Sequence, residues 1–185
     1  MRALVITENI TIDGVIDLGA GWFEPATGDS ADADLLEVLR EQDDRADAML
    51  LGRQTFEDFR GYWPLQTDDR TGITDYLNRV TKYVVSSTLQ DPRWENTVVL
   101  RGPVVDEVAA LKSVPGADIV CTGSVTLTRA LVSAGLVDEY RLFVYPVVTG
   151  RGSRLFEESA GIPRLTLQEC RSFCSGVVLL SYRPE

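Results

Sequence analysis

The sequence predicts an α/β fold in which helices cover a mixed β-sheet. In the first two thirds of the chain, short apolar runs alternate with segments whose leucines and valines recur at helical spacing. In the last third, apolar runs at 140–148, 165–173 and 177–182 follow one another without an intervening helix. A sheet that is parallel at first and antiparallel at its end fits this order of elements.

The first half of the chain is expected to alternate strands with helices. Leu35, Leu36 and Leu39 recur at helical spacing, with charged residues on the opposite side. The predicted elements are a strand at 3–6 that continues past a bend to Val15, a loop at 19–29, a helix from Ser30, a strand at 48–51, a short helix beginning at Phe56, a loop at 61–64, a helix at 73–80 and a strand at 82–86.

The second half begins with the same alternation and then changes to strands alone. We expect a strand at 97–100 and a helix at 104–111 with Val105, Val108 and Leu111 on one buried face. A strand at 117–121, a helix at 124–133 and the three late strands complete the chain. No repeat or linker divides the sequence, so we expect a single domain over residues 1–185.

Composition restricts the classes of function. The formal net charge is -10, which disfavours binding to nucleic acid or to an anionic membrane surface. The N-terminus lacks the apolar core of a secretory signal, and no stretch approaches the length of a membrane span. We therefore expect a cytoplasmic protein whose partner is a small molecule.

The chain contains no histidine, which excludes Ser-His-Asp and Cys-His nucleophilic sites and any zinc site that needs imidazole. Asp29, Asp32 and Asp34 form an acidic cluster, but it lacks the glycine and the final glutamate of a calcium-binding loop. The cluster is typical of the start of a helix. We expect no metal site.

Three cysteines, Cys121, Cys170 and Cys174, do not form the framework of a secreted disulfide protein. The spacing of the last two would place both on one face of a strand. We expect reduced thiols that pack in the protein rather than a redox pair.

Three corners follow predicted parallel strands, at Gly52, Ser86 and Gly123. The carboxyl ends of parallel strands meet at one edge of a sheet, where open α/β sheets bind ligands. A glycine before a helix lets backbone N–H groups approach a phosphate at the positive end of the helix dipole. The alternative is that the glycines only permit tight turns. Arginine, threonine and serine beside the corners favour an anion site.

Five motifs in a fixed order span most of the chain: TIDGVID at 11–17, LLGRQTFE at 50–57, KYVVSSTL at 82–89, the Gly123-Ser124 corner and GLVDEYRLFVYPVVTGRGSRLFE at 135–157. They resemble motifs of the dihydrofolate reductase-like family, in particular the reductase domain at the C-terminus of the bifunctional riboflavin deaminase-reductase. This resemblance implies a three-layer α/β/α fold with a mixed central sheet. It also implies an NADPH site along the carboxyl edge of the sheet.

The resemblance assigns roles to residues of this chain. Arg53 would face the adenosine 2′-phosphate, with Ser86 and Ser87 as hydroxyl donors to it. Gly52 and Thr55 would belong to the same phosphate corner, residues 123–126 would form a second corner at the pyrophosphate, and Asn9 with Thr11 would flank the nicotinamide. The implied cofactor-binding residues are Asn9, Thr11, Gly52, Arg53, Thr55, Ser86, Ser87, Gly123, Ser124, Val125 and Thr126. Trp22, Phe23, Tyr62 and Trp63 would line a pocket for a planar substrate. Asp34 is the candidate acid, with a solvated first-turn helix residue as the alternative.

The chain also departs from the family pattern. It carries no zinc deaminase segment, and Thr122-Gly123-Ser124 stands where dihydrofolate reductases have two glycines. Apart from Arg60 and Arg70, the predicted pocket loops offer no basic residues for a ribose phosphate.

The leading hypothesis is an NADPH-dependent reductase of a small planar heterocycle that resembles a pterin or a riboflavin precursor. The alternative is a non-catalytic NADPH-binding or sensor protein on the same scaffold. Relatives in the family commonly pair, so the resemblance also implies a homodimer.

Overall fold

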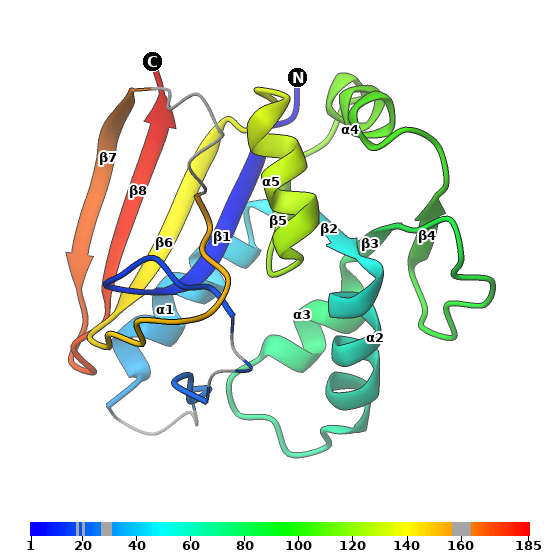
Figure 1. Cartoon of the computed structure of the whole chain (residues 1–185). Coiled ribbons are helices and arrows are strands. Elements are labelled where there is room, and N and C mark those ends of the chain that lie inside the picture. The colour runs from blue at the N-terminus through cyan, green and yellow to red at the C-terminus, as the bar shows by residue number, and fades with distance from the viewer. Residues whose placement is uncertain (18, 20, 27–30, 157–163) are drawn as a thin grey trace.

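Eight strands form one mixed sheet at the centre of the protein (Figure 1). They are β1 (Leu4–Thr11), β2 (Ala46–Gly52), β3 (Thr81–Val85), β4 (Thr97–Leu100), β5 (Asp118–Cys121), β6 (Glu139–Tyr145), β7 (Leu165–Ser172) and β8 (Val178–Pro184). This computed structural model describes all residues except 18, 20, 27–30 and 157–163.

The strand order is β4-β3-β2-β5-β1-β6-β8-β7. Neighbouring strands from β4 to β6 are parallel, whereas β8 runs antiparallel to both β6 and β7. The predicted mixed sheet with an antiparallel end is confirmed. Because β1 lies between β5 and β6 and β2 pairs with β5, the carboxyl ends of β1, β2 and β5 meet at one edge.

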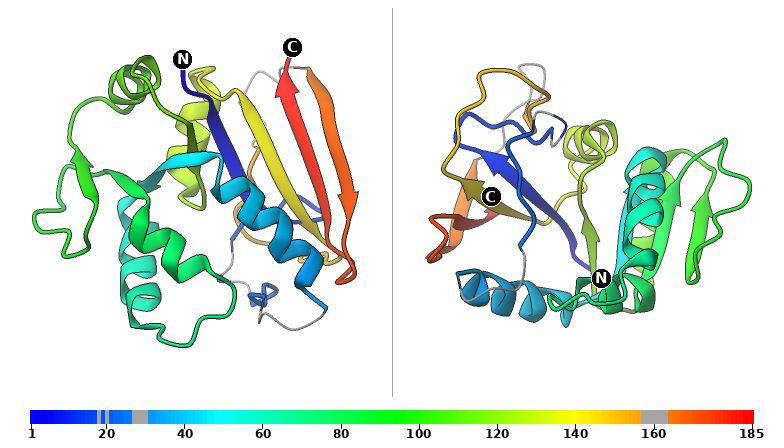
Figure 2. Two further views of the ribbon diagram at one scale, coloured as in Figure 1. Left: turned by 180° about the vertical axis from the view of Figure 1, so that it is seen from behind. Right: turned by 90° about the horizontal axis from the view of Figure 1, so that it is seen from below.

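Helices cover both faces of the sheet, so the predicted three layers are present. The helices are α1 (Ala33–Asp43), α2 (Arg53–Tyr62), α3 (Ile73–Arg79), α4 (Val104–Ser113) and α5 (Val125–Ser133). Figure 2 shows α1 and α5 on opposite sides of the sheet. The N-termini of α2 and α5 directly follow β2 and β5.

Successive side chains of each strand face opposite sides of the sheet, so the core has one layer on each side. Leu50 faces α4 and α5, in one cluster with Ile6 and Ile119, whereas its neighbours Met49 and Leu51 pack with α2 and α3. A third cluster joins α1 to the antiparallel end of the sheet. Burial of each such side chain contributes about 1.5–3 kcal/mol, so the parallel strands are fixed from both sides.

The structure corrects the loop predicted at 61–64. Helix α2 continues to Tyr62, and a 3₁₀ helix, η2 (Trp63–Leu65), follows directly. Pro64 does not break this segment, because a proline in the first turn of a helix lacks only an N–H that has no partner in the helix.

Two further predictions were wrong in detail. Val105 is 41% exposed, and Val104 packs against the core in its place. The strand predicted to reach Val148 ends at Tyr145, since Pro146 follows it and cannot donate to the ladder.

The cysteines also differ from the prediction. Cys170 lies on β7, but Cys174 lies in the turn that follows that strand, so the two do not share a strand face. Both thiols are free and exposed rather than packed, whereas Cys121 is buried. Among the described helices, none combines the length and apolar composition that a bilayer crossing requires.

Candidate functional site

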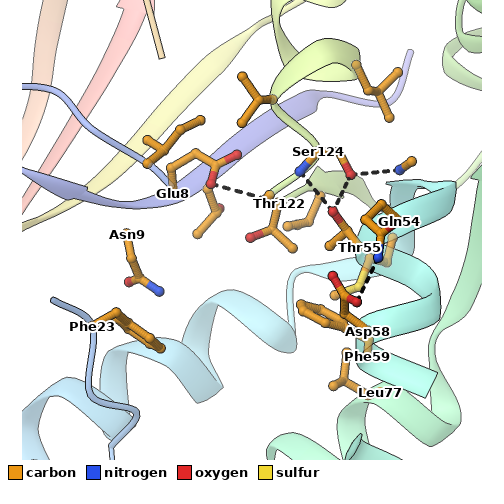
Figure 3. A pocket seen from close by; sticks show the side chains of 18 of the residues that line it. Glu8, Asn9, Phe23, Gln54, Thr55, Asp58, Phe59, Leu77, Thr122 and Ser124 are labelled. Atoms are coloured by element: carbon orange, nitrogen blue, oxygen red, sulfur yellow. Dashed lines mark hydrogen bonds between the residues drawn. The ribbon is translucent and has the colours of Figure 1, made fainter. Parts of the chain in front are cut away.

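A cleft of about 910 Å³ opens where the carboxyl ends of β1, β2 and β5 meet. Its lining comes from β1, the loop after β1, α1, α2, α3, α5 and β6. Figure 3 shows part of this lining, with Thr55 and Ser124 at one end and Phe23 well separated from them. The predicted convergence of the Gly52 and Gly123 corners at one crevice is therefore confirmed.

The two corners are bonded directly to each other. The N–H of Gly52 donates to Ser124 Oγ at 2.8 Å, and the N–H of Ser124 donates to Thr55 Oγ1 at 3.0 Å. The Ser124 hydroxyl also donates to Thr55 Oγ1, at 2.8 Å (Figure 3). We call residues 52–55 and 122–126 together the paired corner. It brings the first turns of α2 and α5 side by side.

Glycine is required at both positions by close approach. A Cβ on Gly52 would lie 3.0 Å from Ser124 Oγ. A Cβ on Gly123 would lie 3.0 Å from Thr55 Cγ2, and the φ of +59° at Gly123 is unfavourable for other residues. Ser124 itself has a φ of +52° and caps α5. The serine in place of a second glycine thus supplies the hydroxyl that joins the corners.

The paired corner fits an anionic cofactor. The N–H groups of Gly52, Gly123 and Ser124 have partners inside the protein. The first-turn N–H groups of a helix have no partner within the helix, and Val125 and Thr126, in the first turn of α5, line the cleft. Two adjacent helix N-termini of this kind attract a pyrophosphate.

A second hollow of about 470 Å³ adjoins the paired corner, and Arg53 lines both spaces. The hollow also contains Arg60, Thr88 and Arg93. The Arg53 guanidinium lies 2.8 Å from Glu57 Oε2 and is about half exposed, so it remains accessible to a phosphate. Three arginines around one hollow suit a phosphate group.

Ser86 and Ser87, the predicted hydroxyl donors to the 2′-phosphate, do not line this hollow. Ser86 is buried, and its hydroxyl oxygen accepts the N–H groups of Thr88 and Leu89. Among the described residues that line the two spaces, Thr88 is present and Ser86 and Ser87 are absent. The Ser86 hydroxyl therefore shapes the turn that presents Thr88.

The first and last family motifs are joined by Asp13. Its carboxylate accepts the Thr11 hydroxyl at 2.6 Å, the N–H of Thr149 at 3.3 Å and the N–H of Gly150 at 2.8 Å. Hydrogen bonds from Thr11 and these N–H groups hold the pKa of Asp13 below its usual range. Thr11, predicted to flank the nicotinamide, is buried and also accepts the N–H of Val15. Its observed role is to position the chain after β1, which supplies the cleft wall.

The half of the cleft away from the paired corner is aromatic. Phe23 and Tyr145 line it, and we call it the aromatic half, whereas Phe59 and Trp63 line the cleft on the side of α2. In Figure 3, Phe23 and Asn9 lie on one side, opposite Phe59. Phe23, Trp63 and Asn9, three of the predicted site residues, thus line the cleft.

Two of the predicted pocket aromatics do not line the cleft among the described residues. Trp22 packs edge-on against Phe23 and Tyr145, and its indole N–H donates to Asp17 O at 2.9 Å. Tyr62 is 52% exposed and packs against Trp63. They support their neighbours rather than contacting the space itself.

Asp34, the predicted acid, lies outside the cleft lining. One carboxylate oxygen accepts the N–H of Leu35 and the other accepts the N–H of Cys174, each at 2.9 Å. The Cys174 N–H is the main cause that keeps the pKa of Asp34 low. These bonds connect α1 to the β7–β8 turn, so the geometry supports a structural role. No group of three His, Cys, Asp or Glu side chains in the described parts of the chain is arranged to hold a metal.

A buried acid that sequence reasoning missed, Glu8, lies in the cleft lining. Its side chain is only 3% exposed, and its Oε2 accepts the N–H of Gly123 at 3.1 Å (Figure 3). A signal was available, because Glu8 occupies the register of Leu4, Ile6 and Ile10, the apolar face of β1. A carboxyl group in a buried apolar register requires an explanation.

The carboxyl group of Asp43 lines the cleft at the end of α1. Burial, reinforced by the neighbouring Asp44, raises the pKa of Asp43 to about 7. Asp17 and Asp58 also line the cleft, and Arg53 is the one basic residue among its described lining residues. Because the undescribed residues contain no lysine or arginine, positive charge in this cleft is confined to the paired corner.

Comparison with known proteins agrees with this architecture. Solved structures with the same fold include a pyrimidine reductase-like protein from Corynebacterium diphtheriae, which matches with a TM-score of 0.68 and 20% identity over 100% of this chain and 92% of that chain. Another is a diaminohydroxyphosphoribosylaminopyrimidine deaminase/5-amino-6-(5-phosphoribosylamino)uracil reductase from Thermotoga maritima, with a TM-score of 0.67 and 14% identity. This chain covers 57% of that longer protein. The mixed sheet and its cleft thus define a protein of the dihydrofolate reductase-like α/β fold.

The sequence comparison identifies the family. The model of the RibD C-terminal domain matches residues 2–179, and the chain belongs to this family. The uncharacterised protein YyaP of Bacillus subtilis is 31% identical over 98% of this chain and 94% of its own length. Membership of this family supports a reductase-type role.

Proposed function

We propose that this protein is an NADPH-dependent reductase of a small planar heterocycle. The observation that carries the proposal is the paired corner, in which two helix N-termini are bonded side by side at the end of a cleft with an aromatic half. When bound, NADPH would supply hydride, so the protein need only position two rings and manage a proton.

The cofactor would lie along the paired corner. The first-turn N–H groups of α5, at Val125 and Thr126, would bind the pyrophosphate, and Arg53 would bind the 2′-phosphate in the adjoining hollow. Asn9 would lie beside the nicotinamide at the centre of the cleft. These assignments use only groups that line the two spaces.

The substrate would occupy the aromatic half. Phe23 and Tyr145 pack edge-to-face with ring centroids 5.5 Å apart, and together they offer an aromatic wall for a pterin-like or pyrimidine-like ring. Asp17 lines the cleft in the same loop as Phe23, and Arg53 is assigned to the cofactor end. We therefore propose a neutral or cationic substrate rather than one with a phosphate group.

Titration of the purified protein with NADPH, followed by nicotinamide fluorescence, tests this proposal. Arg53→Ala should weaken NADPH about 10-fold or more and leave NADH affinity nearly unchanged, because only NADPH carries the 2′-phosphate and a charge-assisted hydrogen bond contributes about 1.5–3 kcal/mol. Arg45→Ala, an exposed change of equal charge before β2, is the matched control. Absence of NADPH binding to the wild type at high micromolar concentration would refute the proposal.

Binding and turnover need separate measurements. Loss of the reduced-nicotinamide absorbance in the presence of a candidate pterin or aminopyrimidine supports the reductase. Tight NADPH binding without oxidation by any of these heterocycles would instead favour a non-catalytic binding protein on the same scaffold.

We further propose a cytoplasmic homodimer. Support for pairing comes from β7, an edge strand whose residues are mostly exposed, including Leu167 at 51%. An exposed edge offers unpaired backbone groups to a second copy. Light scattering should give twice the chain mass of 20.4 kDa, and a monomeric mass would contradict the dimer.

A further inference from the structure

The face of the sheet that carries α1 has a gap in its apolar packing. One hydrophobic cluster joins α1 to β6 and β8, and a separate cluster packs α2 and α3 against β2 and β3. Between them lie β1 and β5, the two central strands, where Thr7, Asn9 and Val120 line the cleft and are only partly buried. Central strands of a helix-covered parallel sheet are normally buried on both faces, so the gap is a space that a ligand can enter.

The cleft continues through this gap as a groove, which we call the α1–α3 groove. Helix α1 runs back from the carboxyl edge of the sheet toward the start of β2, so Leu35 lies near the mouth of the groove and Asp43 at its inner end (Figure 1). From Leu35 to Asp43 the helix axis rises about 12 Å. The walls of the groove are Leu35, Leu39 and Asp43 of α1 and Ile73, Tyr76 and Leu77 of α3.

The inner end of the groove holds two polar groups that lack partners. The carboxyl group of Asp43 forms no hydrogen bond or ion pair with a described residue, and the charges that act on it are those of Asp44 and Arg79. Tyr76 is close enough that burial and the Asp43 carboxyl together raise its pKa above the usual range. Its side chain is 6% exposed, and its hydroxyl has no hydrogen-bond partner among the described residues. A buried polar group without a partner calls for one.

The charges around the groove favour a cation as that partner. Arg53 is the one basic residue among the described lining residues of the cleft, and it lies at the paired corner. Arg79 is exposed and is not among the described lining residues. An ammonium group carries three N–H donors, enough for a carboxylate and a hydroxyl oxygen at once. An anion would instead meet Asp43 without a compensating charge.

We propose that the substrate carries an apolar arm that ends in an ammonium group, and that this arm fills the α1–α3 groove. This inference rests on the proposed function and names the substrate class. The planar ring lies in the aromatic half, the arm passes Leu35 and Leu39, and the ammonium donates to the Asp43 carboxylate and the Tyr76 hydroxyl oxygen. No bond is made or broken at this end, so the groove determines which heterocycle is accepted.

Three matched probes test the groove without NADPH. The compounds 4-phenylbutylamine, 4-phenylbutan-1-ol and 4-phenylbutyrate share a ring and an arm and differ only in the terminal group. At pH 8, above the pKa of about 7 for Asp43, calorimetric titration should show the amine binding about tenfold more tightly than the alcohol. A hydrogen bond to a charged group is stronger than a neutral one. The carboxylate should bind most weakly. Equal affinities for amine and alcohol would overturn the inference.

Substitutions locate the preference at the inner end. Asp43→Asn should abolish the preference for the amine and keep the alcohol affinity within twofold, and Asp43→Ala replaces it if that variant does not fold. Tyr76→Phe should weaken the amine about threefold. Glu41→Gln, which removes the same charge from an exposed position of α1, is the matched control and should keep the preference. An Asp43→Asn protein that still selects the amine would overturn the inference.

The outcome separates this inference from the proposed function. The probe affinities are measured on the protein alone, so failure of the wild type to bind NADPH would remove the proposed function without altering them. A wild type that binds NADPH but does not prefer the amine would remove only the cationic arm.

Discussion

The paired corner and the aromatic half lie in the same cleft but are held in different ways. The corner is fixed by hydrogen bonds between residues at and after the ends of β2 and β5, and a Cβ on either of two glycines there would lie 3.0 Å from a neighbouring side chain. The aromatic half is assembled by packing of Trp22, Phe23 and Tyr145 from two distant segments. This difference indicates a rigid site for the proposed cofactor and an adaptable site for the proposed substrate.

Gly123→Ala should have the largest effect of the changes that test this difference. The new Cβ would meet Thr55 and would also impose an unfavourable positive φ. We expect NADPH affinity to fall about 100-fold, equivalent to about 2.7 kcal/mol, by titration. The free energy of unfolding in urea should fall by about 1–3 kcal/mol.

Gly135→Ala is the matched control for this change. Gly135 has a φ of +65° near the end of α5, but a Cβ there would meet nothing within 4 Å. It should lose about 1 kcal/mol of stability and keep NADPH affinity within twofold. Equal losses of affinity in both variants would show that close approach at the paired corner is unimportant.

Thr55→Val should have the next largest effect, because it keeps the side-chain shape and removes one hydroxyl. The N–H and the hydroxyl of Ser124 would both lose their acceptor. We expect a loss of about 1–3 kcal/mol in unfolding free energy and roughly tenfold weaker NADPH binding. Thr55→Ser, which keeps the hydroxyl, should retain the wild-type stability and NADPH affinity. A valine variant with wild-type affinity would argue against a preorganised corner.

Phe23→Ala should separate the two halves of the cleft. It removes a ring that packs against Trp22 and Tyr145 at the substrate end. We expect KM for the heterocycle to rise about tenfold while NADPH affinity stays within twofold, measured on the same preparation. Phe23→Leu, which keeps apolar bulk, should give a KM between those of the wild type and the alanine variant. If NADPH affinity fell by a larger factor than KM rose, the cofactor would have to lie in the aromatic half.

The smallest expected effect is on the pH dependence of stability. Because the pKa of Glu8 is raised in the folded protein, the native state binds a proton that the unfolded state releases. Its contribution is fully present below the unfolded pKa of 4.5 and is lost as pH rises through the folded pKa. Glu8→Gln should remove a slope of at most about 1.4 kcal/mol per pH unit. Urea unfolding of both proteins from pH 4 to 9 measures this, and parallel curves would indicate an unshifted Glu8.

The same contrast explains what could be predicted from sequence. The corners at Gly52 and Gly123 are local signals, in which a glycine separates an apolar strand from a helix, and both were predicted correctly. The bonds from Thr55 to Ser124 join residues far apart in the chain and leave no local pattern. Glu8 left a readable signal, a charge in an apolar register, whereas the position of Asp34 depends on its contact with the distant Cys174 N–H.

A structure of the protein with bound NADPH tests the central claim most directly. We predict the pyrophosphate at the first turn of α5, by Val125 and Thr126, the 2′-phosphate at Arg53 and the nicotinamide beside Asn9. A cofactor that lies between Phe23 and Tyr145, or a cleft left empty at saturating NADPH, would contradict the claim.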